Sequence, residues 1–259
     1  MVSADIIRTV VGILGNVIAL GLFLSPVPTF YRIWKKGSVE QFSPVPYLAT
    51  LLNCMFWVVY GLPLVHPGST LVLTINGSGS FIELFYVFLF IFYSEGPRRL
   101  RVLLILLTEI AFVGAVALSV IEATPSYDRR SLIIGILCVF FGTMMYAAPL
   151  SVMKLVIQTK SVEYMPLFLS VASFLNGACW TTYALIRFDL FITIPNSLGV
   201  LFAVAQLVLY AVYYKSTRRQ IEARKSKAET SVVEVVVMEE SNKICKATQN
   251  GSHPETQNT

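Results

Sequence analysis

Seven long apolar segments dominate the sequence and limit the folds open to it. They span about residues 10–30, 45–65, 70–93, 101–121, 132–153, 165–186 and 190–214. Each approaches the roughly 20 apolar residues that a helix needs to cross the hydrocarbon core of a bilayer. Only 14% of the residues are charged, against about 25% in an ordinary soluble domain. The sequence therefore predicts an all-α, multi-pass membrane protein with seven transmembrane helices, embedded in a lipid bilayer.

The positive residues predict which side of the membrane each connection faces. Sixteen Lys and Arg residues follow the first, third and fifth helices or lie in the tail, and four lie on the other side. Since cytoplasmic loops are enriched in positive residues, we expect the N-terminus outside and the tail in the cytosol. The net charge of +5 comes from these helix ends and the tail, so we expect no nucleic-acid partner. The tail, 215–259, is polar and poor in aromatic residues, which favours disorder.

The chain contains an internal repeat. Shifting the sequence by 123 residues aligns 12–61 with 135–184 without a gap, and 12 of the 50 aligned pairs are identical. Each unit holds three helices, and the fourth helix is left over. An odd spacer between two three-helix units gives both units the same orientation, so the repeats are parallel and related by an axis along the membrane normal. In membrane transporters that are built from parallel repeats of this kind, the substrate binds near the midplane, between the repeats.

We therefore predict a 3+1+3 fold with four parts. These are a first three-helix repeat (1–94), a linker helix with its flanking loops (95–131), a second three-helix repeat (132–214) and the cytosolic tail (215–259).

Two asparagines occupy equivalent positions inside the third helix of each unit. Beyond the next loop the register of the repeat shifts by three, so that Asn76 aligns with Asn196. A carboxamide offers two donors and two acceptors, and a pair from opposing bundles can bind a polyhydroxy ligand without any charge. Hydrogen bonding between helices is the alternative. Because polar groups at this depth are rare, we favour ligand contact.

Two tryptophans repeat in the same way. Trp57 and Trp180 lie one turn from Asn53 and Asn176, on roughly the same helix face. An indole ring packs well on the apolar face of a pyranose. The alternatives are helix packing and an interfacial belt. Because their mid-helix position argues against a belt, we favour stacking on a ligand.

Four prolines fall toward the cytosolic ends of helices; they are Pro26, Pro46, Pro149 and Pro166. A proline inside a helix kinks it and forms either a hinge or a static bend.

The acidic residues are less informative. Glu83 and Glu109 lie inside apolar segments. Neither has a basic or histidine partner in the pattern, so we favour a structural role over proton coupling. We expect Asp189 to suit the N-terminus of the seventh helix.

The sequence indicates no enzyme, cofactor or metal site. Its four cysteines form no CxxC pair, and two histidines are too few for a metal cluster. No Ser/His/Asp or Cys/His arrangement occurs within the helices. A seven-helix receptor is a remote alternative, because it does not explain the repeat. A receptor would also have a DRY-like cluster at the cytosolic end of the third helix, where this chain has Tyr93-Ser-Glu-Gly-Pro-Arg98.

Several motifs together resemble the SWEET sugar transporters of plants, over about residues 1–215. They are Gly12-Ile-Leu-Gly-Asn16, Leu24-Ser-Pro-Val-Pro-Thr-Phe30, Asn53-Cys…Trp57…Tyr60-Gly61, Thr74-Ile-Asn76-Gly77, Lys160-Ser-Val-Glu-Tyr-Met-Pro166 and Pro195-Asn196. The resemblance implies a bidirectional, energy-independent sugar uniporter that works by alternating access and forms homo-oligomers.

The resemblance also implies roles for individual residues. Asn76 and Asn196 match the asparagines that bind sugar, and Trp57 and Trp180 match the aromatic residues that flank it. The four prolines match a tetrad near the cytosolic gate. Tyr60, Tyr183 and Asp189 match residues near the outer gate.

The same resemblance suggests the size of the substrate. Four pocket positions tend to be smaller in the sucrose-carrying branch; here they are Leu22, Asn53, Met145 and Asn176. Because packed interiors resist added volume, we expect a monosaccharide, glucose first. The short sequence segments around Asn53, Asn176 and Asp189 look most like those of the hexose-carrying branch, which is usually placed at the plasma membrane. A sucrose uniporter and a proton–sugar symporter remain alternatives.

Overall fold

The computed structural model describes residues 3–250, except for the side chains at positions 228, 231–237, 240–242 and 244–250. The described residues form helices and short connections, without strands. The helices are α1 (Ala4–Phe23), α2 (Val27–Lys36), α3 (Val45–Gly61), α4 (Thr70–Tyr93), α5 (Gly96–Ala123), α6 (Tyr127–Met144), α7 (Ala147–Thr159), α8 (Leu167–Ile186) and α9 (Leu190–Asn250).

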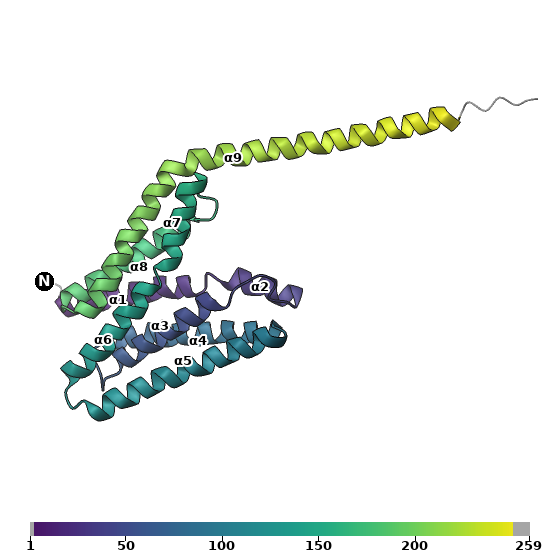
Figure 1. Cartoon of the computed structure of the whole chain (residues 1–259). Helices are drawn as coiled ribbons and strands as arrows, with labels where there is room; N and C mark the ends of the chain where they lie inside the picture. Colours follow the sequence, from purple (N-terminus) through teal and green to yellow (C-terminus); the bar gives the residue numbers. More distant parts are fainter. Residues whose placement is uncertain (1–2, 251–259) are drawn as a thin grey trace, which may run out of the picture.

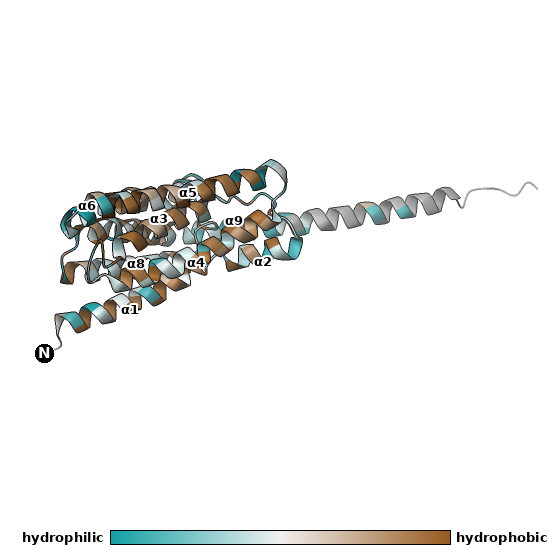
Figure 2. Ribbon diagram, turned by 90° about the horizontal axis from the view of Figure 1, so that it is seen from below, coloured by the Kyte–Doolittle hydropathy of each residue, from teal (hydrophilic) through white to brown (hydrophobic). Residues whose placement is uncertain are grey.

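These helices make seven apolar spans. Six are long enough to cross a membrane: α1 with α2, α4, α5, α6 with α7, α8, and α9 as far as Lys227. The seventh, α3, is apolar over 17 residues, about 26 Å at 1.5 Å per residue. Figure 2 shows apolar residues over most of the bundle and hydrophilic residues gathered toward the helix ends. The predicted all-α, seven-span fold is confirmed.

Two of the seven spans are broken. The chain leaves the helix at Leu24–Pro26, between α1 and α2, and again at Met145–Tyr146, between α6 and α7. Pro26 has no N–H to continue the helical ladder, and the next amide, that of Val27, bonds to the Leu24 carbonyl instead. Pro149 lies in the first turn of α7, where a missing N–H costs little.

The other two prolines of the predicted tetrad do not interrupt a helix. Pro46 lies in the first turn of α3, and Pro166 immediately precedes α8. These two positions mark helix starts rather than kinks, because a proline fits the first turn of a helix without losing a hydrogen bond.

The packing of the helices repeats the sequence pattern. Within each unit the second helix packs along the third, as α3 on α4 and α8 on α9. Between the units, α1 packs on α8 and its counterpart α6 packs on α3. The leftover helix α5 lies against α3, α4 and α6 (Figure 1). Each unit therefore uses its first membrane helix to contact the second membrane helix of the other unit.

The tail differs from the prediction of a disordered segment after Lys215. Helix α9 continues without a break to Asn250 and leaves the bundle (Figure 1). Residues 215–250 include no Gly or Pro and many Glu, Lys, Arg and Ala residues, all of which favour a helix. Polarity alone was therefore a poor guide to disorder here. The remaining predicted tail, 251–259, lies outside the described residues.

Candidate functional site

A cavity of about 430 Å³ lies between the two repeats. All eight residues that the sequence analysis assigned to sugar binding line it: Leu22, Asn53, Trp57, Asn76, Met145, Asn176, Trp180 and Asn196. They come from both repeats in four equivalent pairs. The remaining lining residues are apolar or uncharged: Ala19, Phe23, Val72, Ile75, Gly142, Tyr146, Ser173, Ile192 and Pro195. The volume is within the usual range for a small-molecule site.

The two central asparagines are held in the same way. The Asn76 side-chain nitrogen donates to the Val72 carbonyl at 2.9 Å, and that of Asn196 donates to the Ile192 carbonyl at 2.8 Å. In both cases the acceptor lies one turn back on the same helix. The carboxamide oxygen and the second N–H make no hydrogen bond with the described residues. Each asparagine can therefore offer one acceptor and one donor to a ligand.

A second asparagine pair carries unsatisfied acceptors. The side-chain oxygens of Asn53 and Asn176 are buried without a hydrogen-bond partner among the described residues. An unpaired buried polar atom costs about 1–3 kcal/mol. Since both residues line the cavity, a hydroxyl group of a bound ligand is positioned to recover part of this cost.

The two tryptophans line the cavity, one from each repeat. The Trp57 ring packs edge-on against Tyr60, with centroids 5.5 Å apart, and Trp180 packs edge-on against Tyr183 at 5.3 Å. Both indoles are buried. Each tyrosine thus lies behind a tryptophan and fixes the orientation of its ring.

The cavity is closed behind these rings, at what we call the tyrosine end. Tyr60 and Tyr183 are almost completely buried, at 0% and 1% exposure. The Tyr60 hydroxyl donates to a carboxylate oxygen of Asp189 at 2.9 Å. The other Asp189 oxygen accepts from the backbone amides of Phe191 and Ile192, at 3.0 and 3.2 Å. Asp189 therefore caps α9, as predicted, and also connects α9 to α3.

Sequence reasoning missed two residues at this end. His66 stacks on the Tyr60 ring at 4.7 Å, and its Nε2 lies 3.8 Å from the Asp189 carboxylate. The Arg8 guanidinium lies 3.9 Å above the Tyr183 ring. Burial lowers the pKa of His66; Asp189 opposes this shift, and Arg8 adds to it. The repeat could not reveal them, because neither was among the residues it matched.

At the opposite end, which we call the proline end, the cavity continues. An adjoining hollow of about 330 Å³ is lined by Ser25, Pro26, Pro46, Tyr47, Thr50 and Glu83. Another of about 200 Å³ is lined by Pro149, Gly199, Phe202, Ala203 and Gln206. Both share Leu22 and Asn176 with the main cavity. Three of the four predicted gate prolines thus flank these hollows, whereas Pro166 lines none of them.

One further contact has no counterpart in the first repeat. Tyr146, aligned with Phe23, donates its hydroxyl to the carbonyl of Pro195. Pro195 lies inside α9 and aligns with Ile75 under the shifted register. A proline interrupts the helical hydrogen bonds at this point, immediately before Asn196. The sequence motif included Pro195, but no role followed from it.

The two intramembrane glutamates lie apart. Glu83 is buried beside the hollow at the proline end, whereas Glu109 lines a groove on α5. Neither forms a salt bridge within the described residues. No group of three or more His, Cys, Asp or Glu residues in the described part of the chain could hold a metal ion.

Comparison with known proteins points to a single family. The family described as "Sugar efflux transporter for intercellular exchange" matches residues 9–98 and 132–218, one match for each repeat. The chain is 71% identical over 227 residues to the bidirectional sugar transporter SWEET4 of Oryza sativa subsp. indica, covering 88% of each chain. It is 54% identical over 223 residues to SWEET7 of Arabidopsis thaliana, covering 86% of each.

A solved structure agrees with these matches. The 3.7 Å resolution structure of a eukaryotic SWEET transporter superimposes with a TM-score of 0.79 at 40% identity, over 82% of this chain and 99% of that one. Since the fold, both repeats and the greater part of the sequence match, the chain belongs to the SWEET family of sugar transporters.

Proposed function

We propose that this sugar transporter carries hexoses, glucose first, in both directions and without ion coupling. The sugar binds between the two repeats and crosses by alternating access. One observation carries this proposal: an uncharged cavity lined by four residue pairs that the sequence repeat relates. A neutral polyol needs hydrogen-bond donors and acceptors together with apolar surface, and the asparagine and tryptophan pairs supply both.

The closed tyrosine end and the hollowed proline end support alternating access. In this arrangement Tyr60, Tyr183 and Asp189 act as the outer gate, and the four prolines allow the inner ends of the helices to move. The distribution of Lys and Arg supports a cytosolic proline end. The repeat supports the domain limits 1–94, 95–131 and 132–214. A plasma-membrane location and a homo-oligomer are proposed from the family resemblance.

A transport assay with purified protein tests the function directly. Proteoliposomes without ion or pH gradients are loaded with glucose, and the entry of labelled glucose is followed with and without sucrose as competitor. Rapid exchange that sucrose leaves unchanged supports a hexose uniporter. Strong competition by sucrose would contradict the size argument while retaining uniport.

Variants of the central asparagines test the site. Removing either carboxamide, in Asn76→Ala or Asn196→Ala, should raise the KM for glucose about 2- to 13-fold, which corresponds to about 0.5–1.5 kcal/mol for a neutral hydrogen bond. Gly77→Ala is the matched control, because a Cβ there meets nothing within 4 Å. An unchanged KM in both asparagine variants would contradict the site.

Proton–sugar symport is a second candidate, favoured by the position of Glu83 beside a hollow that adjoins the cavity. It predicts that exchange appears only when a pH gradient is imposed. It also predicts that Glu83→Gln removes this dependence.

A further inference from the structure

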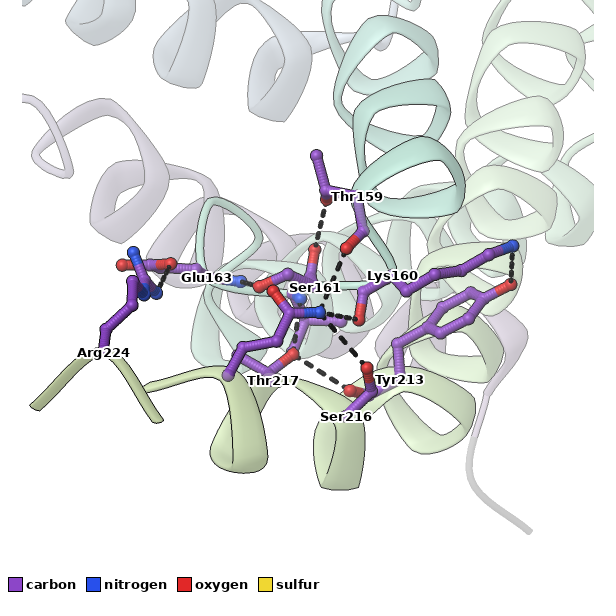
Figure 3. A network of polar contacts seen from close by, with 10 residues as sticks. Thr159, Lys160, Ser161, Glu163, Tyr213, Ser216, Thr217 and Arg224 are labelled. Atoms are coloured by element: carbon purple, nitrogen blue, oxygen red, sulfur yellow. Dashed lines mark hydrogen bonds and ion pairs between the residues drawn. The ribbon is translucent and has the colours of Figure 1, made fainter. Parts of the chain in front are cut away.

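The loop between α7 and α8 is held by side chains of α9 beyond its apolar part (Figure 3). The Val162 amide donates to the Thr217 hydroxyl oxygen at 2.8 Å, and this hydroxyl donates to the Tyr213 carbonyl at 2.9 Å. Thr217 and Val162 are both only 5% exposed. The contact therefore satisfies a buried backbone N–H that has left the helical ladder of α7.

Gln220 binds the end of α7 itself. Its side-chain nitrogen donates to the carbonyls of Thr159 and Lys160, at 3.1 and 3.3 Å. The last carbonyls of a helix lack partners within the helix. One side chain from α9 therefore caps α7 from outside.

This cap meets a local need of the second repeat. Lys160 has a φ of +54°, in the left-handed region, whereas the aligned residue of the first repeat is Gly37, at +66°. Glycine adopts this conformation without the steric cost that a side chain imposes. Lys160 bears that cost, and its ammonium group contacts the Tyr213 hydroxyl at 3.2 Å. The contacts with α9 thus stabilise a turn that glycine would form unaided.

The first repeat holds its equivalent loop in a comparable way. Arg98, at the start of α5, donates to the carbonyls of Glu40 and Phe42. In each repeat, side chains from the segment that follows the third membrane span bind the loop between the first and second spans. This is the α2–α3 loop in the first repeat and the α7–α8 loop in the second. In the second repeat this segment is the beginning of what we expected to be a free tail.

The α7–α8 loop leads directly into the helix that lines the site. It ends at Pro166, where α8 begins, and α8 carries Asn176 and Trp180 into the cavity. We infer that Thr217 and Gln220 are positioning residues of the transport cycle, which hold the α7–α8 loop so that α8 moves as one body with α9. This inference rests on sugar transport as the function, and it makes the chain as far as Arg224 part of the transporter proper.

The contacts should not contribute equally. The Arg224–Glu163 ion pair, at 2.5 Å, joins side chains that are 58% and 36% exposed, and solvent weakens such pairs. The buried Thr217 contact should matter most, because its loss leaves the Val162 N–H without a partner.

A matched set of threonine variants tests the inference. Thr217→Val keeps the shape of the side chain but removes the hydroxyl, whereas Thr217→Ser keeps the hydroxyl. Thr230→Val is the control, because that exposed hydroxyl contacts only the Ser226 carbonyl of its own helix. Glucose transport is measured in proteoliposomes and expressed per folded molecule.

Thr217→Val should reduce Vmax by about fivefold or more, since an unpaired buried N–H shifts an equilibrium by at least that factor. KM should change less than twofold, because Thr217 does not touch the cavity. Thr217→Ser and Thr230→Val should behave as wild type. The inference is overturned if Thr217→Val keeps its Vmax, or if it loses only folded protein while each folded molecule transports normally.

A stability measurement tests the contact without any transport. Gln220→Ala should lower the melting temperature by about 2–4 °C, and adding Lys160→Gly should restore most of it, since glycine no longer needs the cap. An equal loss in the Lys160 and Lys160→Gly backgrounds would refute the role of the cap. If the wild type fails to transport sugar, the proposed function fails, while this result still decides whether the contact exists.

Discussion

The hydrogen bond between Tyr60 and Asp189 gives the sharpest test of the closed tyrosine end. Tyr60→Phe removes only the hydroxyl that lies 2.9 Å from the carboxylate. A hydrogen bond to a charged group contributes about 1.5–3 kcal/mol, which corresponds to a factor of about 10–150 in an equilibrium. The other carboxylate oxygen keeps its two backbone amides, so we expect the lower end of this range, about tenfold.

The change should destabilise the state that is closed at this end and increase the fraction that is open at the tyrosine end. Apparent affinity scales with the fraction of molecules competent to bind. The KM for glucose entering from the tyrosine side should therefore fall, by at most about tenfold. The measurement is zero-trans uptake by cells or oriented vesicles over a range of glucose concentrations.

The repeat supplies the matched control. Tyr183 is equally buried, but its hydroxyl makes no hydrogen bond within the described part of the chain, so Tyr183→Phe should leave the KM unchanged. An unchanged or higher KM in Tyr60→Phe, or the same shift in both variants, would refute the reasoning.

Three further predictions follow from the cavity and its surroundings. Leu22→Val combined with Met145→Val enlarges the cavity in both repeats and should allow sucrose to compete with glucose in exchange; continued exclusion of sucrose would count against the size argument. Burial lowers the pKa of His66 below 6.5, so acidification protonates the unfolded state first and the melting temperature should fall as the pH drops through that region. His66→Gln should make the melting temperature less dependent on pH there, and the same pH dependence in the variant and the wild type would contradict this reasoning. A Cβ at Gly79 would overlap a neighbouring aromatic ring, whereas one at Gly77 meets nothing within 4 Å; Gly79→Ala should lower the melting temperature and Gly77→Ala should not, as thermal unfolding of both variants will show.

The repeat made most of the cavity predictable. Asn76 and Asn196 were identified because the repeat places a carboxamide, rare at this depth, at equivalent positions of both units, and both line the cavity. Leu22 and Met145 carry no chemical signal of their own; they were named only through the family resemblance. The structure places all of these residues around one space, although sugar binding itself stays a prediction.

Contacts that the repeat does not relate were harder to predict. The Tyr60–Asp189 hydrogen bond joins residues 129 positions apart, and hydrophobic periodicity carries no information about such pairs. His66 lies in the loop before α4, where local sequence does not specify which side chains it meets. The helical tail was missed because its polarity suggested disorder, whereas its lack of Gly and Pro allows the helix to continue.

The uncharged lining of the cavity has an electrical consequence. Moving one elementary charge through a membrane potential of 100 mV is worth about 2.3 kcal/mol, enough to drive a charged substrate strongly one way. The cavity lining includes no Asp, Glu, Lys, Arg or His, and a sugar carries no charge either. With sugar as the only cargo, a membrane voltage gives it no preferred direction. Net flow then follows the sugar gradient alone, so that its direction reverses when that gradient reverses.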